Sequence, residues 1–518
     1  MERTVEVNVD RKTFYVTTPI YYVNDIPHIG HSYTTIAADV LARYKRMKGY
    51  DVFFLTGTDE HGQKILKAAK SNNEEPIELA NRTVEKYKCL WKVLNISNDD
   101  FIRTTESKHV KQIVSIFEII YENGDIYLGE YEGWYCIPCE SFWTASQLSS
   151  GNCPECGRSV ERLREKNYFF RLSKYRDLLL KYIEEHPDFI RPESRRNELC
   201  KKILAGMDDI SVSRAAVEWG IPVPMEKTHT IYVWVDALFN YITALGYYDN
   251  SEKLTKYWPA NVQLIGKEIL WFHGVIWPAM LMSLGIEVPY KIYAHGWWTI
   301  EGQKISKSLG NAIDPVRITD KYGVDAYRYF MLREVPFGLD GNFSYNALVN
   351  RINCDLANDL GNLLHRALTM IEKYCDGKVP EARVVSKEGR ELFEKYKVLN
   401  DKVEHAMEDL QFSIALEAIW EYIGLVNKYV EISKPWVLAK DPDTRNKLNE
   451  VLYNLVEAIR IISFFILPFM PNTAEEIQKQ LGLSEDKKPV GDDITWGNMQ
   501  PGISVCKGKP IFPKVIAV

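Results

Sequence analysis

The sequence predicts an α/β fold in which a doubly wound parallel sheet is split by an insertion and followed by an all-α bundle. Patterns typical of strands and helices alternate from Lys12 to Leu55 and again from Thr230 to Ala294. Between them, from Ile126 to Leu163, glycines, cysteines and charges crowd together and the periodicity disappears. Beyond about Leu348 the strand patterns fade and helical spacing dominates, which predicts a separate helical domain.

The first unit is a strand, a helix and a second strand. Lys12 to Tyr22 is rich in β-branched and aromatic residues, and a turn-forming stretch from Asn24 to Pro27 follows it. After this turn, apolar residues recur every three or four positions as far as Tyr44, and Gly49 stands where a helix C-cap would fall. Asp51 to Leu55 is a short apolar run typical of a buried parallel strand, so the unit opens a doubly wound sheet.

The second half of the sheet and the helical bundle are predicted from the same kinds of pattern. Strand-like segments at Val262 to Ile265 and Lys291 to Ala294 flank a helix-like stretch from Glu268 to Leu284. Helical spacing then runs through three long patterns, which are Asn353 to Tyr374, Arg390 to Tyr429 and Asp441 to Leu467. These patterns predict the completion of the sheet and then the bundle.

The composition is that of a folded protein with several domains. The chain has 518 residues and a mass of 60.0 kDa, which corresponds to about three or four domains. A hydrophobic fraction of 46% and a charged fraction of 26% exclude a disordered or collagen-like chain. The net charge of −6 excludes nucleic-acid binding through global charge, so any RNA contact must come from local patches.

No segment of the sequence predicts export or membrane insertion. The stretch from Met1 to Lys12 lacks the apolar core of a signal peptide, and the densest apolar run, Ile461 to Met470, is too short to span a membrane. We therefore expect a cytoplasmic protein without a membrane partner. Nine cysteines, four of them in two close pairs, favour a metal site in a reducing compartment over a disulfide framework.

The two cysteine pairs have the spacing of a metal site. Cys136 and Cys139 form one CxxC, Cys153 and Cys156 form another, and 13 residues separate the pairs. Four thiolates complete the tetrahedral shell of Zn²⁺ and leave no open position, so the pattern predicts one structural zinc per chain. The alternative is two redox pairs or a chance spacing.

Two motifs carry groups suited to phosphate. His28, Gly30 and His31 stand where a strand passes into a helix N-terminus, a place where backbone N–H groups and imidazoles can bind phosphate. Lys304 and Lys307, in the run KISKS, put two ammonium groups in a loop that contains serine and glycine. Taken singly, the first could be two surface histidines and the second a solvated basic loop. The two motifs together, in this order, are a far more specific signal of phosphate binding than either one alone.

With these motifs the sequence resembles the class I aminoacyl-tRNA synthetases, whose signatures are HIGH and KMSKS, and Ile305 replaces the Met of the second. The resemblance to the methionyl-tRNA synthetase family is particularly close and runs almost from end to end. It rests on TTPIYYVNDIPHIGH from Thr17, FLTGTDEHGQK from Phe54, YEGWYC from Tyr131, YVWVDALFNYI from Tyr232, IGKEILWFHGVIWPA from Ile265 and AHGWWT from Ala294.

The resemblance implies a class I Rossmann-type catalytic domain, a zinc-knuckle connective insertion and an anticodon-binding helical bundle. It implies a methionine–tRNA ligase that forms methionyl-adenylate from methionine and ATP and transfers it to the 3'-terminal adenosine of methionine tRNA, initiator and elongator. Catalysis would rest on positioning and charge stabilisation by His28, His31, Lys304 and Lys307, with Mg²⁺ bound to ATP. The implied ATP-binding residues are His28, Gly30, His31, Gly266, Glu268, His295, Gly296, Trp297 and Lys307.

A methionine site is implied at the end of the second strand. Asp59 offers a carboxylate for the substrate ammonium, although taken alone it would be a loop or capping residue. The thioether needs an apolar, polarizable slot, and without the resemblance most of the implied lining would count as ordinary core. Leu238 stands where some family members have Pro. The implied methionine-binding residues are Ile20, Tyr22, Asp59, Trp234, Ala237, Leu238, Tyr241, Ile269, Phe272 and His273.

Three residues of the bundle are implied to bind the anticodon. Asn362 and Arg366 are four positions apart and share a helix face, and Trp436 offers a stacking surface for an unpaired base. Spacing alone favours a polar surface pair and a tryptophan wedged between helices. The resemblance to the anticodon-binding bundle of the family favours the functional interpretation.

We expect five segments along the chain. They are the first half of the catalytic domain at 1–120, the connective insertion at 121–227, the second catalytic half at 228–325, a stem-contact linker at 326–358 and the anticodon-binding domain at 359–518. The chain ends at Val518, soon after the bundle, which leads us to expect a monomer.

Three other classes share part of this pattern. A valine, isoleucine or leucine synthetase needs a large editing insertion, and the 276 positions from His28 to Lys304 are too few to hold it. A nucleotidyltransferase with the HIGH motif would lack the helical bundle and the zinc insertion. A non-enzymatic RNA-binding zinc module would not retain Lys307, His28 and Asp59 together.

Overall fold

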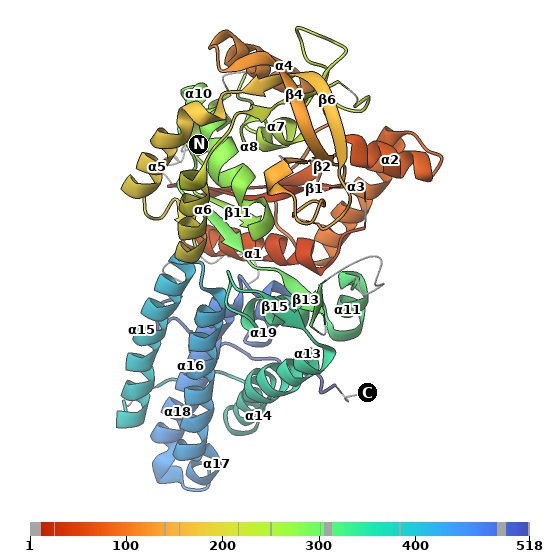
Figure 1. The fold of residues 1–518 in the computed structure, drawn as a ribbon. Helices are drawn as coiled ribbons and strands as arrows, with labels where there is room; N and C mark the ends of the chain where they lie inside the picture. Colours follow the sequence, from red (N-terminus) through yellow and green to blue (C-terminus); the bar gives the residue numbers. More distant parts are fainter. Residues whose placement is uncertain are drawn as a thin grey trace, which may run out of the picture.

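The structure is a computed structural model, and it describes residues 12–24, 26–138, 141–143, 145–154, 156–215, 217–248, 251–300, 302–304, 313–382, 385–483 and 494–515. A sheet with its covering helices stands above a domain of long helices, and α1 (Ile29–Met47) runs along the boundary between them (Figure 1). This arrangement confirms the predicted fold class.

The central sheet is parallel and doubly wound. Over the described residues it has six strands in the order β3, β2, β1, β11, β12, β7, and every neighbouring pair is parallel. From β1 the chain moves outward on one side through β2 and β3 and later on the other side through β11 and β12, as such sheets do. The bounds are β1 Thr13–Tyr22, β2 Asp51–Asp59, β3 Asp100–Arg103, β7 Ile190–Arg191, β11 Val262–Gly266 and β12 Ile292–His295.

Both faces of this sheet are covered by helices, which explains why its strands read as apolar runs. Phe14 and Val16 of β1 belong to a core that includes α1 and α3 (Pro76–Val93). Tyr15 belongs to a second core with α4 (Ser107–Glu122) and α10 (Trp277–Ser283). A small third core joins α2 (Gln63–Ser71) to α3.

The insertion is a sheet of its own, which the sequence patterns did not predict. β4 (Ile126–Cys136) and β6 (Glu161–Phe170) form a long antiparallel ribbon, flanked by β5 (Ser141–Trp143) and β8 (Ile210–Ser211). Leu128 is 52% exposed on this ribbon, and apolar residues follow one another from Ile126 to Leu128, so the sequence shows no clear alternation of apolar and polar residues. The insertion also contains α5 (Arg176–Glu185), α6 (Glu193–Ala205) and the paired strands β9 (Ser213–Arg214) and β10 (Thr230–Ile231).

The second catalytic half contains shorter helices than the sequence suggests. The stretch expected as one helix from Glu268 to Leu284 begins with a 3₁₀ turn, continues through a π-helical turn at Phe272–Ile276 and ends in α10. The other elements of this half are α7 Val233–Leu238, α8 Asn240–Thr243, α9 Glu252–Tyr257, β13 Trp298–Ile300, β14 Gln303–Lys304 and α11 Pro315–Tyr322. After them come α12 Val324–Arg333 and β15 Gly341–Phe343, which pairs with β13.

The last part of the chain is helical, as predicted. The pattern from Arg390 to Tyr429 covers two helices, α15 and α16, because Leu410 adopts a left-handed backbone conformation with φ 58° and reverses the chain. The helices are α13 Tyr345–Arg351, a π-helical segment at Ile352–Gly361, α14 Asn362–Cys375, α15 Lys387–Glu408, α16 Phe412–Ser433, α17 Pro435–Leu438, α18 Arg445–Ile466 and α19 Pro471–Gln480. None of the helices described is both long and apolar enough to cross a membrane.

Candidate active site

The carboxyl ends of the parallel strands meet at one edge of the sheet, and several of the predicted site residues lie there. β1 ends at Tyr22, β2 at Asp59, β11 at Gly266 and β12 at His295. Ligands of open α/β sheets bind outside these carboxyl ends. The sheet topology therefore brings together residues that lie more than 200 positions apart in the sequence.

His28 and His31 close the N-terminus of α1 with a reciprocal pair of hydrogen bonds. The backbone N–H of Gly30 donates to Nδ1 of His28 at 3.1 Å, and the backbone N–H of His28 donates to Nδ1 of His31 at 3.2 Å. The two rings stack with centroids 3.9 Å apart. The motif thus forms a capping box in which imidazoles replace the usual hydroxyl and carboxylate.

This geometry determines which ring nitrogen carries the proton. A backbone N–H can bond only to an unprotonated nitrogen, so each neutral ring carries its proton on Nε2. Burial, and then the neighbouring His28, lower the pKa of His31 well below its usual value. The first turn of α1 therefore combines Nε2–H donors with the positive end of the helix dipole, a combination suited to a phosphate.

A second group of predicted residues lies where β11 and β12 end. His295 donates from Nδ1 to the carbonyl of Gly296 at 2.8 Å and accepts at Nε2 from the Thr34 hydroxyl of α1 at 2.6 Å. Burial lowers its pKa, so the ring is neutral. A Cβ at Gly296 would lie 2.3 Å from the backbone of Leu339, so this close approach requires glycine.

Glu268 and Trp297 face each other across this edge. The indole N–H of Trp297 donates to Oε2 of Glu268 at 2.5 Å, and both residues are exposed. A Cβ at Gly266 would meet the carboxylate of Glu268 at 2.5 Å. The two glycines thus allow close packing of Leu339 and Glu268, and the exposed indole of Trp297 offers a surface on which a flat ring can lie.

The predicted methionine residues lie around a shared core beside Asp59. The Asp59 side chain, at the end of β2, is 3% exposed. The rings of Trp234 and Phe272 stack with centroids 3.8 Å apart. The remaining predicted members of this core are Ile20 and Tyr22 from the end of β1, Leu238, Tyr241 and Ile269. Ala237 is buried next to Leu238 on α7.

Tyr241 and His273 are joined by a buried hydrogen bond. His273 donates from Nδ1 to the carbonyl of Ile269 at 3.0 Å, and so its Nε2 accepts from the Tyr241 hydroxyl at 2.8 Å. Burial lowers the pKa of His273 to about 4. The ring is neutral near pH 7, so this pair adds polarity without adding charge to an aromatic part of the core.

A buried polar cluster around Asp236 of α7 escaped the sequence analysis. Asp236 accepts from Nδ1 of His61 and from Nε2 of His109, both at 2.7 Å, and the other nitrogen of His109 bonds to the Thr243 hydroxyl. The two imidazoles offset the cost of burying Asp236 and hold its pKa below the ordinary value. The sequence signal was a lone carboxylate within the apolar run YVWVDALFNYI.

Of the two predicted lysines, only Lys304 lies among the described residues. Lys304 belongs to the short strand β14, which pairs with β13 directly after β12. Lys307, with Ile305, Ser306 and Ser308, lies outside the described residues.

Three of the four predicted zinc ligands form a cluster. The sulfur atoms of Cys136, Cys153 and Cys156 lie within 4.8 Å of one another, and those of Cys136 and Cys156 are 3.5 Å apart. Sulfur atoms around tetrahedral Zn²⁺ are separated by about 3.8 Å, so these positions fit a metal ion. Cys136 and Cys153 are buried, and Cys139 lies outside the described residues.

The predicted anticodon residues lie in the helical domain, away from the sheet. Asn362 is exposed at the start of α14, and Arg366 on the same helix pairs with Glu431 of α16. Trp436 is 38% exposed on α17, which stands at the end of the helical domain farthest from the sheet (Figure 1). The tryptophan is thus accessible and is not wedged in the core.

Family models match most of the chain. The model for class I tRNA synthetases (M) matches residues 14–164 and 158–368. The model for the anticodon-binding domain of tRNA ligases matches residues 389–494.

Curated and solved relatives agree with these matches. The chain is 57% identical to the methionine–tRNA ligase of Caldanaerobacter subterraneus over 98% of the chain and 79% of that protein. It is 51% identical to the methionine–tRNA ligase of Thermotoga maritima over 97% of the chain and 80% of that protein. Mycobacterium tuberculosis methionyl-tRNA synthetase in complex with methionyl-adenylate superposes with a TM-score of 0.94 at 43% identity, over 97% of this chain and all of that chain. The chain therefore belongs to the methionyl-tRNA synthetase family of class I aminoacyl-tRNA synthetases.

Proposed function

We propose that the chain activates methionine with ATP and transfers the methionyl group to the 3'-terminal adenosine of methionine tRNA. The observation that carries this proposal is the neutral Tyr241–His273 pair in an aromatic cluster of the core that includes the end of β1, at the sheet edge where buried Asp59 ends β2. An aromatic, uncharged environment near one carboxylate suits an amino acid with an apolar, polarizable side chain.

In the first step, binding places the methionine carboxylate next to ATP. Asp59 pairs with the substrate ammonium, while Trp234, Phe272 and the other slot residues hold the thioether. Adenosine lies over Gly30 and against Gly266, Glu268 and the His295–Trp297 segment. A carboxylate oxygen then attacks the α-phosphorus, and the bond to the β-phosphate oxygen breaks with release of pyrophosphate.

Charge develops on the phosphates during this attack, and the signature residues face that charge. The Nε2–H groups of His28 and His31 donate to phosphate oxygens from the end of the α1 dipole. Lys304 and Lys307 supply ammonium groups that follow the charge of the transition state. ATP carries Mg²⁺, which shields its phosphate charge.

In the second step, a terminal ribose hydroxyl of the tRNA attacks the mixed anhydride and AMP leaves. The hydroxyl oxygen forms the new ester bond to the methionyl carbonyl carbon and gives up its proton to the departing phosphate, whose oxygen leaves with the electrons of the broken bond. Asn362, Arg366 and Trp436 bind the anticodon at the far end of the helical domain, which selects methionine tRNA, initiator or elongator.

We assign zinc to the cysteine cluster and the functional units to the expected segments. Cys136, Cys139, Cys153 and Cys156 hold one Zn²⁺ that stabilises the insertion. The catalytic halves correspond to 1–120 and 228–325, the insertion to 121–227, the stem-contact linker to 326–358 and the anticodon-binding domain to 359–518. Action as a cytoplasmic monomer is part of the same proposal.

Pyrophosphate exchange into ATP, measured with each of the twenty amino acids, tests the proposal. We expect exchange with methionine to exceed exchange with every other amino acid. A hydrophobic pocket discriminates by about 1–3 kcal/mol for each missing methylene, which corresponds to roughly 10- to 200-fold. Exchange that is absent with methionine, or equal with another amino acid, would overturn the assignment.

A further inference from the structure

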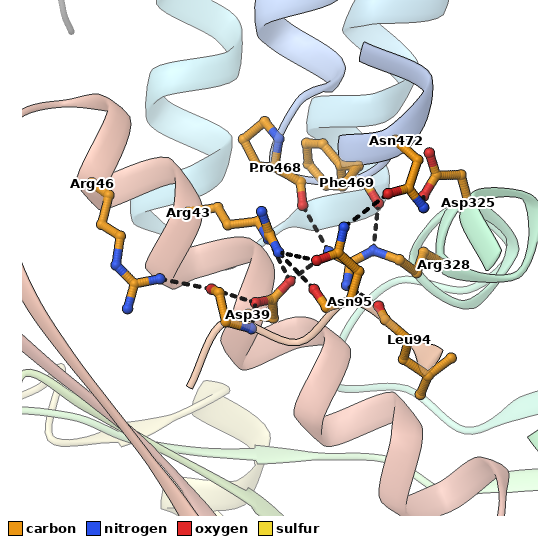
Figure 2. Close-up of polar contacts among 11 residues, drawn as sticks. Asp39, Arg43, Arg46, Leu94, Asn95, Asp325, Arg328, Pro468, Phe469 and Asn472 are labelled. Carbon is orange, nitrogen blue, oxygen red and sulfur yellow. Dashed lines mark hydrogen bonds and ion pairs between the residues drawn. The ribbon is translucent and has the colours of Figure 1, made fainter. Parts of the chain in front are cut away.

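Arg328 of α12 is a fully buried arginine that joins three separate parts of the chain (Figure 2). Its Nε donates to the carbonyl of Phe469 at 2.9 Å, and its two terminal nitrogens donate to the carbonyls of Leu94 and Pro468 at 3.0 and 2.9 Å. One terminal nitrogen also pairs with Asp39 of α1 at 2.7 Å. A planar guanidinium makes all of these bonds only when its acceptors hold one fixed arrangement.

Both carboxylate oxygens of Asp39 accept hydrogen bonds. Its Oδ1 accepts from the backbone N–H and the hydroxyl of Ser97, and its Oδ2 accepts from Arg43 and Arg328. Burial would raise its pKa, but the two guanidinium groups and Ser97 hold the pKa below its ordinary value. The carboxylate is therefore charged, and all its bonds point to fixed neighbours.

The network continues into the helical domain. Arg43 donates to the carbonyl of Asn95, whose amide donates to the side chain of Asn472 at 2.9 Å. The backbone N–H of Thr473, at the start of α19, donates to Asp325 of α12 at 2.6 Å. The turn between α18 and α19 is thus bound both to α12 and to the loop that follows α3 (Figure 2).

A separate contact joins α12 to the signature end of α1. The Tyr327 hydroxyl lies 2.6 Å from the hydroxyl of Ser32, and both groups are buried. Ser32 follows His31 directly, and Asp39 lies about two turns further along the same helix. Neighbouring residues of α12, Tyr327 and Arg328, therefore contact α1 at two places.

The kind of contact is informative because a buried ion pair is a poor way to gain stability. Desolvation of both charges offsets most of their attraction, and well-packed apolar residues at the same place often stabilise the fold equally well. Four bonds from one guanidinium instead define an orientation between α1, α12 and the turn after α18. This boundary separates the active-site edge from the anticodon residues.

We propose that Asp39 and Arg328 are positioning residues for tRNA charging. The pair holds α1, whose first turn carries His28 and His31, at a fixed angle to the helical domain. A tRNA bound at its anticodon then delivers its 3' end to the adenylate. This inference rests on the proposed function, because it requires one RNA to contact both domains.

The test compares three reactions of the Arg328→Lys variant, which keeps the positive charge and loses the forked geometry. We expect kcat/KM for charging full-length methionine tRNA to fall about tenfold or more, because small misplacements of reacting groups cost up to 100-fold. Methionine-dependent pyrophosphate exchange should stay within about twofold of the wild-type rate. Charging of an acceptor-stem minihelix, measured at high enzyme concentration, should also stay within about twofold, because this RNA does not span the two domains.

A matched control is available at the same boundary. Lys48, directly after α1, pairs with Glu404 of α15 at 3.2 Å, and their side chains are 27% and 42% exposed. An exposed pair contributes little, so Lys48→Gln should leave all three reactions unchanged. Asp39→Asn is the second test variant, because it keeps the size of the side chain if Arg328→Lys does not fold.

The outcomes separate the possible roles. A selective loss with full-length tRNA supports the positioning role, since a loss of folded enzyme would lower all three reactions equally. Equal losses in all three reactions, or no loss in any, would overturn it. Exchange that is absent with methionine in the wild type would overturn the proposed function instead.

Discussion

His28 and His31 show how one residue type can serve structure and chemistry at once. Each ring uses Nδ1 to accept a backbone N–H of the first turn of α1, and this fixes the proton on Nε2. An ordinary Ser or Glu cap would satisfy the same backbone groups without presenting a second donor. The site therefore gains two oriented donors from residues that the helix already requires.

Lys307 is expected to act on the transition state and not on substrate binding. Lys307→Ala should lower the rate of methionyl-adenylate formation by roughly 100- to 1000-fold, because its ammonium faces charge that develops only during attack. Single-turnover measurements check the rate, and methionine binding should change little. The exposed Lys321 of α11 provides the control variant Lys321→Ala. Near-normal rates with weakened methionine binding would contradict the assignment.

His273 is expected to make the stability of the catalytic unit depend on pH. Its folded pKa of about 4 lies below the ordinary value of 6.5, so the unfolded chain binds the extra proton first as pH falls. The wild type should thus lose up to about 1.4 kcal/mol per pH unit between pH 6.5 and about 4, an effect that is absent in His273→Gln. Thermal melting at pH 7 and pH 5 checks whether the gap between the two proteins narrows. A gap that does not change with pH would contradict a lowered pKa.

At the scale of elements, none of the described residues at the outer end of the β4–β6 ribbon belongs to the three hydrophobic cores. Tyr135, Cys136 and Cys153 are nevertheless buried there. The stability of such a segment must come from another source, and bound metal supplies folding energy where a core is lacking. We therefore interpret the cysteine cluster as a structural substitute for hydrophobic packing.

Removal of one zinc ligand is expected to disorder the insertion while leaving the central sheet folded. Cys153→Ser should reduce the zinc content from about one per chain and increase amide hydrogen exchange between residues 130 and 165. Metal analysis and hydrogen exchange check the two effects. Cys200→Ser is the control, because Cys200 lies on α6 outside the cluster. Less than about one zinc in freshly prepared wild-type protein would count against the site.

At the scale of the whole molecule, the two candidate sites occupy different domains joined across α1 and α12. A chain with a net charge of −6 gains little from general attraction to RNA, so tRNA choice must depend on specific contacts. The arrangement also allows each site to be tested separately, because activation of methionine requires only the sheet edge.

Trp436 is expected to matter for tRNA charging and not for methionine activation. Base stacking on an aromatic ring contributes about 1–3 kcal/mol, so Trp436→Ala should lower charging of methionine tRNA by roughly ten- to a hundredfold. Pyrophosphate exchange without tRNA should not change, because the residue lies on α17, far from the sheet. Val437→Ala, half exposed on the same helix, is the control. Equal losses in both reactions would mean that the tryptophan supports the fold of the bundle.

Much of the molecule could be predicted from local patterns. The strand before His28, the helix after it and the apolar run that ends before Asp59 follow from residue type and spacing, which act within a few positions. The paired CxxC motifs predicted a cluster that three of the four cysteines form. These features depend on short-range geometry, and so the sequence by itself determined them.

Other features depend on long-range contacts, and only the tertiary structure decided them. The ribbon of β4 and β6 leaves no clear period of two in the sequence, because apolar residues follow one another without alternation, as from Ile126 to Leu128. His61 and His109 gave no sign that they share the carboxylate of Asp236, and Arg328 gave no sign of its buried pair with Asp39, 289 positions away. A charged residue is expected from sequence to be exposed, because most charged side chains are. Only the folded chain shows which opposite charges and carbonyls bind a charged group that is buried.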